Sequence, residues 1–283
     1  MRTRAMENRP TVHDGPQYLR FDTFNRLLHG LLMFSFLGLA FTGMPLLFSD
    51  ARWAPALAAA FGGQHAAGRL HRVFAVLLIA CFVTHVMRLL HRLFVRKELE
   101  ILWGPASMTP QPRDVVEMIA HLRWFLRLGP RPRFEHFTYW EKFDYWAVFW
   151  GMGVIGGSGL MLWFPEFFAR VLPGSWFNVA LLVHGEEGLL AAGFIFTIHF
   201  FNSHLRPEKF PMDPVIFTGR ITEHELIEER PEEYDRLRAA RTLADHQVGA
   251  GAHWVPTLAK AVAIVAVTLG LVMVVMIVSA VLF

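Results

Sequence analysis

Four histidines lie in two long apolar segments of the chain at nearly equal spacing. His71 and His85 are 14 residues apart in one segment, and His184 and His199 are 15 residues apart in another. If both segments are helices, each separation corresponds to about 21–22 Å along the axis, with both rings on roughly one face. Polar groups are costly in such segments and are usually functional. The spacing therefore predicts two sites, each with one imidazole from each helix.

Paired imidazoles suit one kind of cofactor better than others. Two imidazoles on opposite sides can supply both axial ligands of an iron porphyrin, which leaves no open position and suits electron transfer rather than oxygen chemistry. Zinc is a poor alternative, because two imidazoles leave its tetrahedral coordination unfilled and no carboxylate is aligned with them. A single histidine that only packs is common, but four at matched depths are not explained by packing. We expect two haems, one held by His71 and His184 and the other by His85 and His199.

The haems should be non-covalently bound, as in b-type cytochromes. The only cysteine is Cys81, so the chain has no Cys-x-x-Cys-His motif for covalent haem, no disulfide and no thiolate cluster for iron–sulfur. No glycine-rich nucleotide motif is present either. Any substrate chemistry should therefore belong to other subunits, and no catalytic residue is expected.

The elements that must position these histidines are membrane helices. Hydrophobic residues make up 54% of the 283-residue chain and charged residues 18%, so the charges must be confined to loops. A helix needs roughly 20 apolar residues to cross the hydrocarbon core. Five runs qualify, which predicts an all-α integral membrane bundle whose first four helices form the haem-binding core: 27–48, 70–94, 145–164, 177–201 and 257–283.

Basic residues predict the orientation of the bundle. They gather in the amino tail, around the second loop and around the fourth loop, whereas the opposite side has only Arg52, Arg69, Arg72 and Arg170. Because basic loops stay in the cytoplasm, we expect a multi-pass protein of the bacterial inner membrane with a cytoplasmic amino terminus and a periplasmic carboxyl terminus. Membrane lipid is the expected surroundings, and no nucleic-acid partner is indicated.

The remaining segments complete the predicted organisation. Residues 1–23 form a cytoplasmic tail, 24–210 the four-helix domain, 211–256 a charged cytoplasmic loop and 257–283 the fifth membrane helix. Within the second loop, 113–129 has apolar residues at helical spacing with basic residues opposite. This pattern indicates an amphipathic helix that either lies on the inner membrane surface or packs on a partner.

Charged residues near the membrane edges are further site candidates. Arg69, Arg72, Arg88 and Arg206 flank the predicted ligands and could pair with haem propionates; for Arg88 and Arg206, a role in topology alone is an equal alternative. Glu186 and Glu187 follow His184 and could take protons from a quinol, although a solvated helix start explains them too.

The histidine-bearing segments resemble a known family. "LHRVFAVLLIACFVTHVMRLL" and "VHGEEGLLAAGFIFTIHF" resemble the paired-histidine helices of cytochrome b in quinol-oxidising bc-type complexes. Residues 24–48 resemble the first helix of the cytochrome b subunits that anchor formate dehydrogenases and nickel–iron hydrogenases, which share Arg26, His29, Thr42 and Gly43 as they stand here. The resemblance covers roughly residues 20–210.

The expected haem nearer the cytoplasm is called the inner haem, and the one between His71 and His184 the outer haem. The two relatives imply different ligands for the inner haem. The dehydrogenase-anchor pattern implies His29 with His199, whereas the bc-type pattern implies His85 with His199. We expect His85, because it lies on the face already set by His71. His29 is the alternative, or it binds a third haem with His91 or His204, or serves a quinone site.

The resemblance implies a di-haem b-type cytochrome subunit of a respiratory or photosynthetic redox complex. Such a subunit carries electrons between the membrane quinone pool and a partner, which the family suggests is a periplasmic multihaem c-type cytochrome or an iron–sulfur protein. Two alternatives remain open: a self-contained transmembrane reductase of ferric iron or quinone, and a haem-free membrane anchor.

Overall fold

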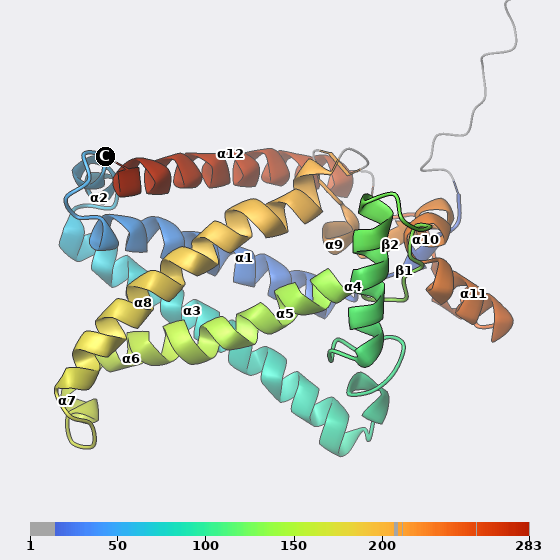
Figure 1. Cartoon of the computed structure of the whole chain (residues 1–283), viewed down its shortest axis with the longest axis horizontal. Helices are drawn as coiled ribbons and strands as arrows, with labels where there is room; N and C mark the ends of the chain where they lie inside the picture. The colour runs from blue at the N-terminus through green and yellow to red at the C-terminus, as the bar shows by residue number, and fades with distance from the viewer. Residues whose placement is uncertain (1–14, 207–208, 211, 253, 283) are drawn as a thin grey trace, which may run out of the picture. The chain divides into compact units, whose positions relative to one another are not determined.

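The computed structural model describes residues 15–206, 209–210, 212–252 and 254–282 (Figure 1). Helices account for 73% of the described residues, so the predicted all-α membrane bundle is confirmed. The chain forms two compact units. Unit 1 comprises Met1–Arg26, Lys97–Phe143 and Pro214–Pro256; unit 2 comprises Leu27–Arg96, Asp144–Asp213 and Thr257–Phe283.

Five helices among the described residues are long and apolar enough to cross a membrane, as expected. They are Thr23–Leu47, Gln64–Val95, Tyr139–Trp163, Ser175–Leu205 and Trp254–Leu282. The second and third helices begin about six residues earlier than expected, because the helical backbone continues beyond the apolar run at its amino-terminal end. The α-helices that make up the five spans are α1 (Thr23–Leu47), α3 (Gln64–Leu90), α5 (Tyr139–Gly151), α6 (Gly157–Trp163), α8 (Ser175–Phe194) and α12 (Trp254–Leu282).

Four π-helical turns interrupt or extend these spans. They are η1 (His91–Val95), η3 (Met152–Gly156), η4 (Ile195–His199) and η5 (Phe201–Leu205). Each π turn places one more residue in a turn than an α-helix does, so it rotates the side chains that follow, and such turns are frequent at functional sites. Of these turns, η3 contains Ile155 and η4 ends at His199.

The core of unit 2 is formed where α1, α8 and α12 meet. Phe196, Phe200 and Met273 are buried there among small residues. At Gly270 of α12, an added Cβ would lie 2.6 Å from Phe200 and 2.9 Å from Phe196. The fifth helix can pack this closely on the fourth because Gly270 has no side chain.

Unit 1 contains a small antiparallel sheet that the sequence analysis did not predict. Its strands are β1 (Gln17–Leu19), β2 (Arg220–Thr222) and β3 (Gln247–Val248), in the order β2-β1-β3. The predicted amino-terminal tail therefore supplies the central strand from its described part. Tyr18 is buried there against Val215, Ile221 and Leu226, and these contacts stabilise strands that are too short to show an alternating pattern.

Short helices complete the chain. They are α2 (Ala54–Ala60), α4 (Pro112–Phe125), α7 (Pro165–Phe168), α9 (Val215–Thr218), α10 (Glu223–Glu229) and α11 (Pro231–Ala239), with 3-10 turns η2 (Leu99–Ile101) and η6 (Leu243–His246).

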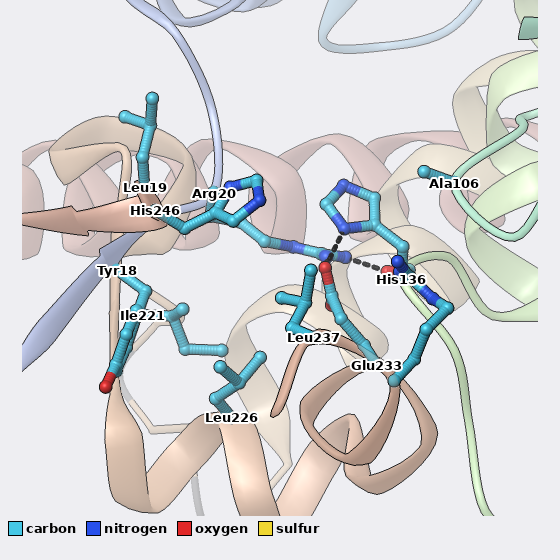
Figure 2. A pocket seen from close by; sticks show the side chains of 11 residues that line it. Tyr18, Leu19, Arg20, Ala106, His136, Ile221, Leu226, Glu233, Leu237 and His246 are labelled. Carbon is cyan, nitrogen blue, oxygen red and sulfur yellow. Dashed lines mark hydrogen bonds and ion pairs between the residues drawn. The ribbon is translucent and has the colours of Figure 1, made fainter. Parts of the chain in front are cut away.

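A buried polar group links the three segments of unit 1 (Figure 2). Glu233 of α11 accepts hydrogen bonds from Arg20, at 3.1 Å, and from Nδ1 of His136. Burial, and then the nearby Arg20 charge, lower the pKa of His136, so the ring is neutral at pH 7 and donates its Nδ1 proton. Burial alone would raise the pKa of Glu233, but the bond from His136 and the charges of Arg20 and Arg230 lower it to about 2.

Candidate functional site

His71 of α3 and His184 of α8 face each other within unit 2. Their ring centroids are 6.2 Å apart and their planes are nearly perpendicular, at 80°. Two metal–imidazole bonds of about 2 Å each, together with the distance from each ring centre to its nitrogen, add up to about this separation. The separation is therefore what one metal atom held between the two rings would require.

The contacts of His71 fix which of its nitrogens is available. Thr42 Oγ1 donates its only proton to the carbonyl oxygen of Gly38, at 2.6 Å. It lies 3.1 Å from Nδ1 of His71 and must accept there. Nδ1 of His71 therefore carries the proton, and Nε2 has the free lone pair that a metal requires.

His184 has the same arrangement on the opposite side. Its Nδ1 lies 2.9 Å from the carbonyl oxygen of Ile155, which can only accept, so Nδ1 again carries the proton. Ile155 belongs to the π turn η3, and Ser158 Oγ lies 3.4 Å from the same ring nitrogen. Both rings thus present Nε2 as a ligand, each oriented by a hydrogen bond from its second nitrogen.

A glycine lies against each of these rings. A Cβ at Gly43 would be 3.0 Å from Cε1 of His71, and one at Gly159 would be 2.9 Å from Cε1 of His184. Each glycine directly follows the hydroxyl residue that approaches the same ring, so Thr42–Gly43 and Ser158–Gly159 form a matched pair. The glycines let the neighbouring helices approach the imidazoles without side-chain bulk.

His199 and His85 have different surroundings from His71 and His184. Nδ1 of His199 lies 3.0 Å from Asp144 Oδ2, and a carboxylate can only accept when ionised, so Nε2 of His199 is again the free nitrogen. In contrast, Nε2 of His85 lies 2.8 Å from the hydroxyl of Tyr145. Its ring packs against Phe149 as well.

His29 of α1 lies near two histidines of the fourth span. It is half-buried, and it is close enough to His199 and His204 to interact with them electrostatically. The structure therefore brings His29 and His199 into one neighbourhood, whereas His85 is engaged by Tyr145.

The predicted propionate partners lie at varied positions. Arg69 and Arg72 are exposed on α3, and the Arg72 guanidinium lies 5.6 Å over the ring of Trp163. Arg88 is half-buried in the last turn of α3, near His85. Arg206 is half-buried directly after η5.

The two glutamates also differ from each other. Glu186 is exposed, whereas Glu187 is half-buried and accepts a hydrogen bond from Trp150 Nε1 at 3.3 Å. Glu187 is thus held beside the third span, one helical turn from His184.

The donor set fits a bis-imidazole porphyrin. In the part of the chain that the structure describes, no three His, Cys, Asp or Glu side chains converge to hold a metal ion. Paired imidazoles with a fixed tautomer and glycines beside the rings match what a porphyrin iron needs from a helical bundle.

Sequence reasoning did not predict the contacts that three residues make with the histidines: Ser158, Gly159 and Asp144. A signal for the first two was present, because the Ser-Gly dipeptide in the third segment repeats the Thr-Gly dipeptide of the first. Asp144 is an acidic residue at the start of an apolar run, which is costly without a partner.

One comparison with known proteins finds a match. The family described as "Prokaryotic cytochrome b561" matches residues 20–203, a range that contains His29, His71, His85, His184 and His199. The comparison with curated proteins finds no match.

Proposed function

Because the chain belongs to the prokaryotic cytochrome b561 family, and is thus a multi-pass membrane protein that transfers electrons through b-type haem, we propose a specific role for it. It carries electrons across the membrane through two haems, between the quinone pool and a partner redox subunit. Each haem supplies reversible one-electron transfer between Fe(III) and Fe(II).

The observation that carries this proposal is the geometry of His71 and His184. Their Nε2 atoms are the free nitrogens, their centroid separation of 6.2 Å fits one iron, and both Nδ1 protons are already bonded. Because the second nitrogen of each ring is anchored, the rings keep their orientation in both oxidation states, which reduces the reorganisation that electron transfer requires.

For the inner haem we propose His29 and His199 as the ligands. This differs from the sequence-based preference for His85, which stays a prediction. Two contacts support His29: it lies near His199, and Nε2 of His85 is engaged by the Tyr145 hydroxyl. Asp144 accepts from Nδ1 of His199, which raises the basicity of the ligand and favours ferric iron.

Redox titration of single variants separates the two assignments. His29→Ala should remove one haem, whereas His85→Ala should keep both haems and shift at most one potential slightly. Loss of a haem in His85→Ala with retention in His29→Ala would reverse the assignment.

The remaining parts of the role follow from charge and position. We propose that the amino terminus is cytoplasmic. Arg69 and Arg72 pair with propionates of the outer haem, and Arg88 and Arg206 pair with propionates of the inner haem.

Glu187, held by Trp150 near His184, is the better placed of the two glutamates to accept a quinol proton. The partner is a periplasmic multihaem c-type cytochrome or an iron–sulfur subunit.

Proteoliposomes test the transfer itself. Ferricyanide is trapped inside vesicles that contain the purified protein, and a membrane-impermeant reductant is added outside. We expect the wild type to reduce the trapped ferricyanide and His71→Ala to lose this activity. Reduction by His71→Ala at the wild-type rate would contradict the proposal, and turnover of external ferric iron or quinone by the protein alone would favour a self-contained reductase.

A further inference from the structure

Helix α4 (Pro112–Phe125) in unit 1 has its polarity reversed relative to a helix of a water-soluble protein. Its acidic residues Asp114 and Glu117 are buried. The apolar side chains of Val115, Ile119 and Leu122 are more than half exposed, at 54%, 51% and 54%. A surface helix in water normally has the opposite arrangement, with its apolar stripe toward the core.

Specific contacts hold α4 in this orientation. Lys142 Nζ lies 2.8 Å and 3.0 Å from the two carboxylate oxygens of Asp114, and both side chains are buried. On the same side, His121 Nδ1 lies 3.1 Å from the Tyr139 hydroxyl. Rotating the apolar stripe inward would break the buried Lys142–Asp114 pair, which is strongly unfavourable.

The exposed stripe is continuous. Val115, Ile119, Leu122 and Leu126 follow one another at intervals of four, three and four residues, which places them on one side of the helix. Leu126 is 69% exposed, and Phe125 beside it is 64% exposed. An apolar surface of this kind marks an interaction site.

Arginines surround the carboxyl-terminal end of this stripe. Arg123, Arg127 and Arg131 are all exposed, and the Arg131 guanidinium lies 5.9 Å over the ring of Trp124. A half-exposed tryptophan among arginines, next to an apolar stripe, is the composition of helices that lie in a membrane interface. Arginines at this position complement the negative headgroups of an anionic leaflet.

We propose that the α4 stripe inserts among the acyl chains of an anionic phospholipid leaflet, with Arg123, Arg127 and Arg131 bound to its headgroups. Five helices among the described residues are long and apolar enough to cross a bilayer, so a lipid surface is present beside this multi-pass membrane protein. A groove on a partner protein would cover the stripe equally well but would not account for the rim of arginines. The inference does not depend on haem binding, because α4 supplies no haem ligand.

Depth-dependent quenching tests the proposal on the full holoprotein. The single native cysteine is first replaced (Cys81→Ala). A fluorophore is then attached at Ile119→Cys in the stripe, at Ala239→Cys on the exposed end of α11, or at Val265→Cys on the exposed side of α12. Each protein is placed in nanodiscs that contain acyl-chain-brominated lipid, made with either phosphatidylglycerol or phosphatidylcholine, and the haem spectrum checks the fold.

We expect strong quenching at position 265 in both lipids, strong quenching at 119 in phosphatidylglycerol, and little at 239. Quenching at 119 gives the ratio of membrane-inserted to non-inserted α4. Each of Arg123→Gln and Arg131→Gln should lower this ratio about fivefold. If 119 is quenched no more than 239, the stripe faces water or a partner protein and the proposal fails. Equal quenching at 119 in the two lipids, or no effect of the arginine changes, would overturn the anionic-lipid assignment.

Discussion

At the residue scale, the site depends on which ring nitrogen of each histidine carries the proton. A neutral imidazole has one donor and one acceptor nitrogen, and the hydrogen bond at one nitrogen determines which role the other plays. Thr42 sets this for His71, the Ile155 carbonyl for His184 and Asp144 for His199. One acceptor on the first span and two on the third span thus leave Nε2 free in each case.

Replacing the Thr42 hydroxyl tests this argument. Thr42→Val keeps the shape but removes the hydroxyl that lies 3.1 Å from Nδ1 of His71, which leaves the Nδ1 proton with the Leu39 backbone as its acceptor. The imidazole then becomes a weaker electron donor to iron, so one haem should show a higher midpoint potential and about 10–100-fold weaker binding. Potentiometric titration of the α-band measures the potential.

The matched control is Thr84→Val. Thr84 is exposed on the same span as His71 and donates only to the Ala80 carbonyl at 2.7 Å. Thr84→Val should therefore leave the midpoint potentials of both haems unchanged. An unchanged titration for Thr42→Val would show that the hydroxyl does not tune the ligand.

At the element scale, small residues decide how closely the helices approach the rings. Gly43 lies on α1 and Gly159 on α6, and each contacts a histidine of the neighbouring helix. The π turn η3 brings the Ile155 carbonyl to the same histidine that Gly159 contacts. The third span therefore holds His184 through backbone geometry rather than through large side chains.

Gly159→Ala should disturb this contact. The added Cβ would lie 2.9 Å from Cε1 of His184, so the ring or the helix must shift, at a typical cost of about 1–3 kcal/mol. We expect partial loss of one haem, measured as haem per chain after purification. Gly153→Ala in the same span meets nothing within 4 Å and should retain full haem content; similar losses in both variants would argue against a specific contact.

At the scale of the whole molecule, unit 1 is held together by buried charge rather than by a large apolar core. Glu233 joins segments from three distant parts of the chain through His136 and Arg20. Its folded-state pKa of about 2 is below the ordinary value of 4.5. Stability from this carboxylate is therefore complete above pH 4.5 and is lost as the pH falls from about 4.5 to 2.

Hydrogen exchange of β1 and α11 amides measures this contribution. Glu233→Gln should lower the free energy of opening by about 3 kcal/mol at pH 7, because it removes the carboxylate that lies 3.1 Å from the buried Arg20 guanidinium. It should also abolish the loss of stability that protonation of Glu233 produces as the pH falls from about 4.5 to 2. The neighbouring Glu232→Gln breaks a partly exposed pair with Arg113 and should cost about 1 kcal/mol or less. Equal exchange in the two variants would contradict this role for Glu233.

Sequence alone predicted the parts of this molecule that have a long-range period. Apolar runs predicted five membrane helices, and the 14- and 15-residue spacings of the histidines indicated that His71 would lie near His184. The strands of unit 1 could not be predicted, because two or three residues show no alternation and their pairing joins segments about 200 residues apart.

The inner ligand was ambiguous for a different reason. His29 and His85 both suit a pairing with His199 in sequence, and only tertiary contacts distinguish them. The partner of His85 is Tyr145, a hydroxyl whose position depends on how the third span packs.

The haem-to-protein ratio tests the central claim most directly. A pyridine haemochrome assay on the purified protein should give two b-type haems per chain for the wild type and one for His71→Ala or for His184→Ala. A wild type without haem, or a ratio that is the same in all three proteins, would contradict the assignment of His71 and His184 as ligands of one iron.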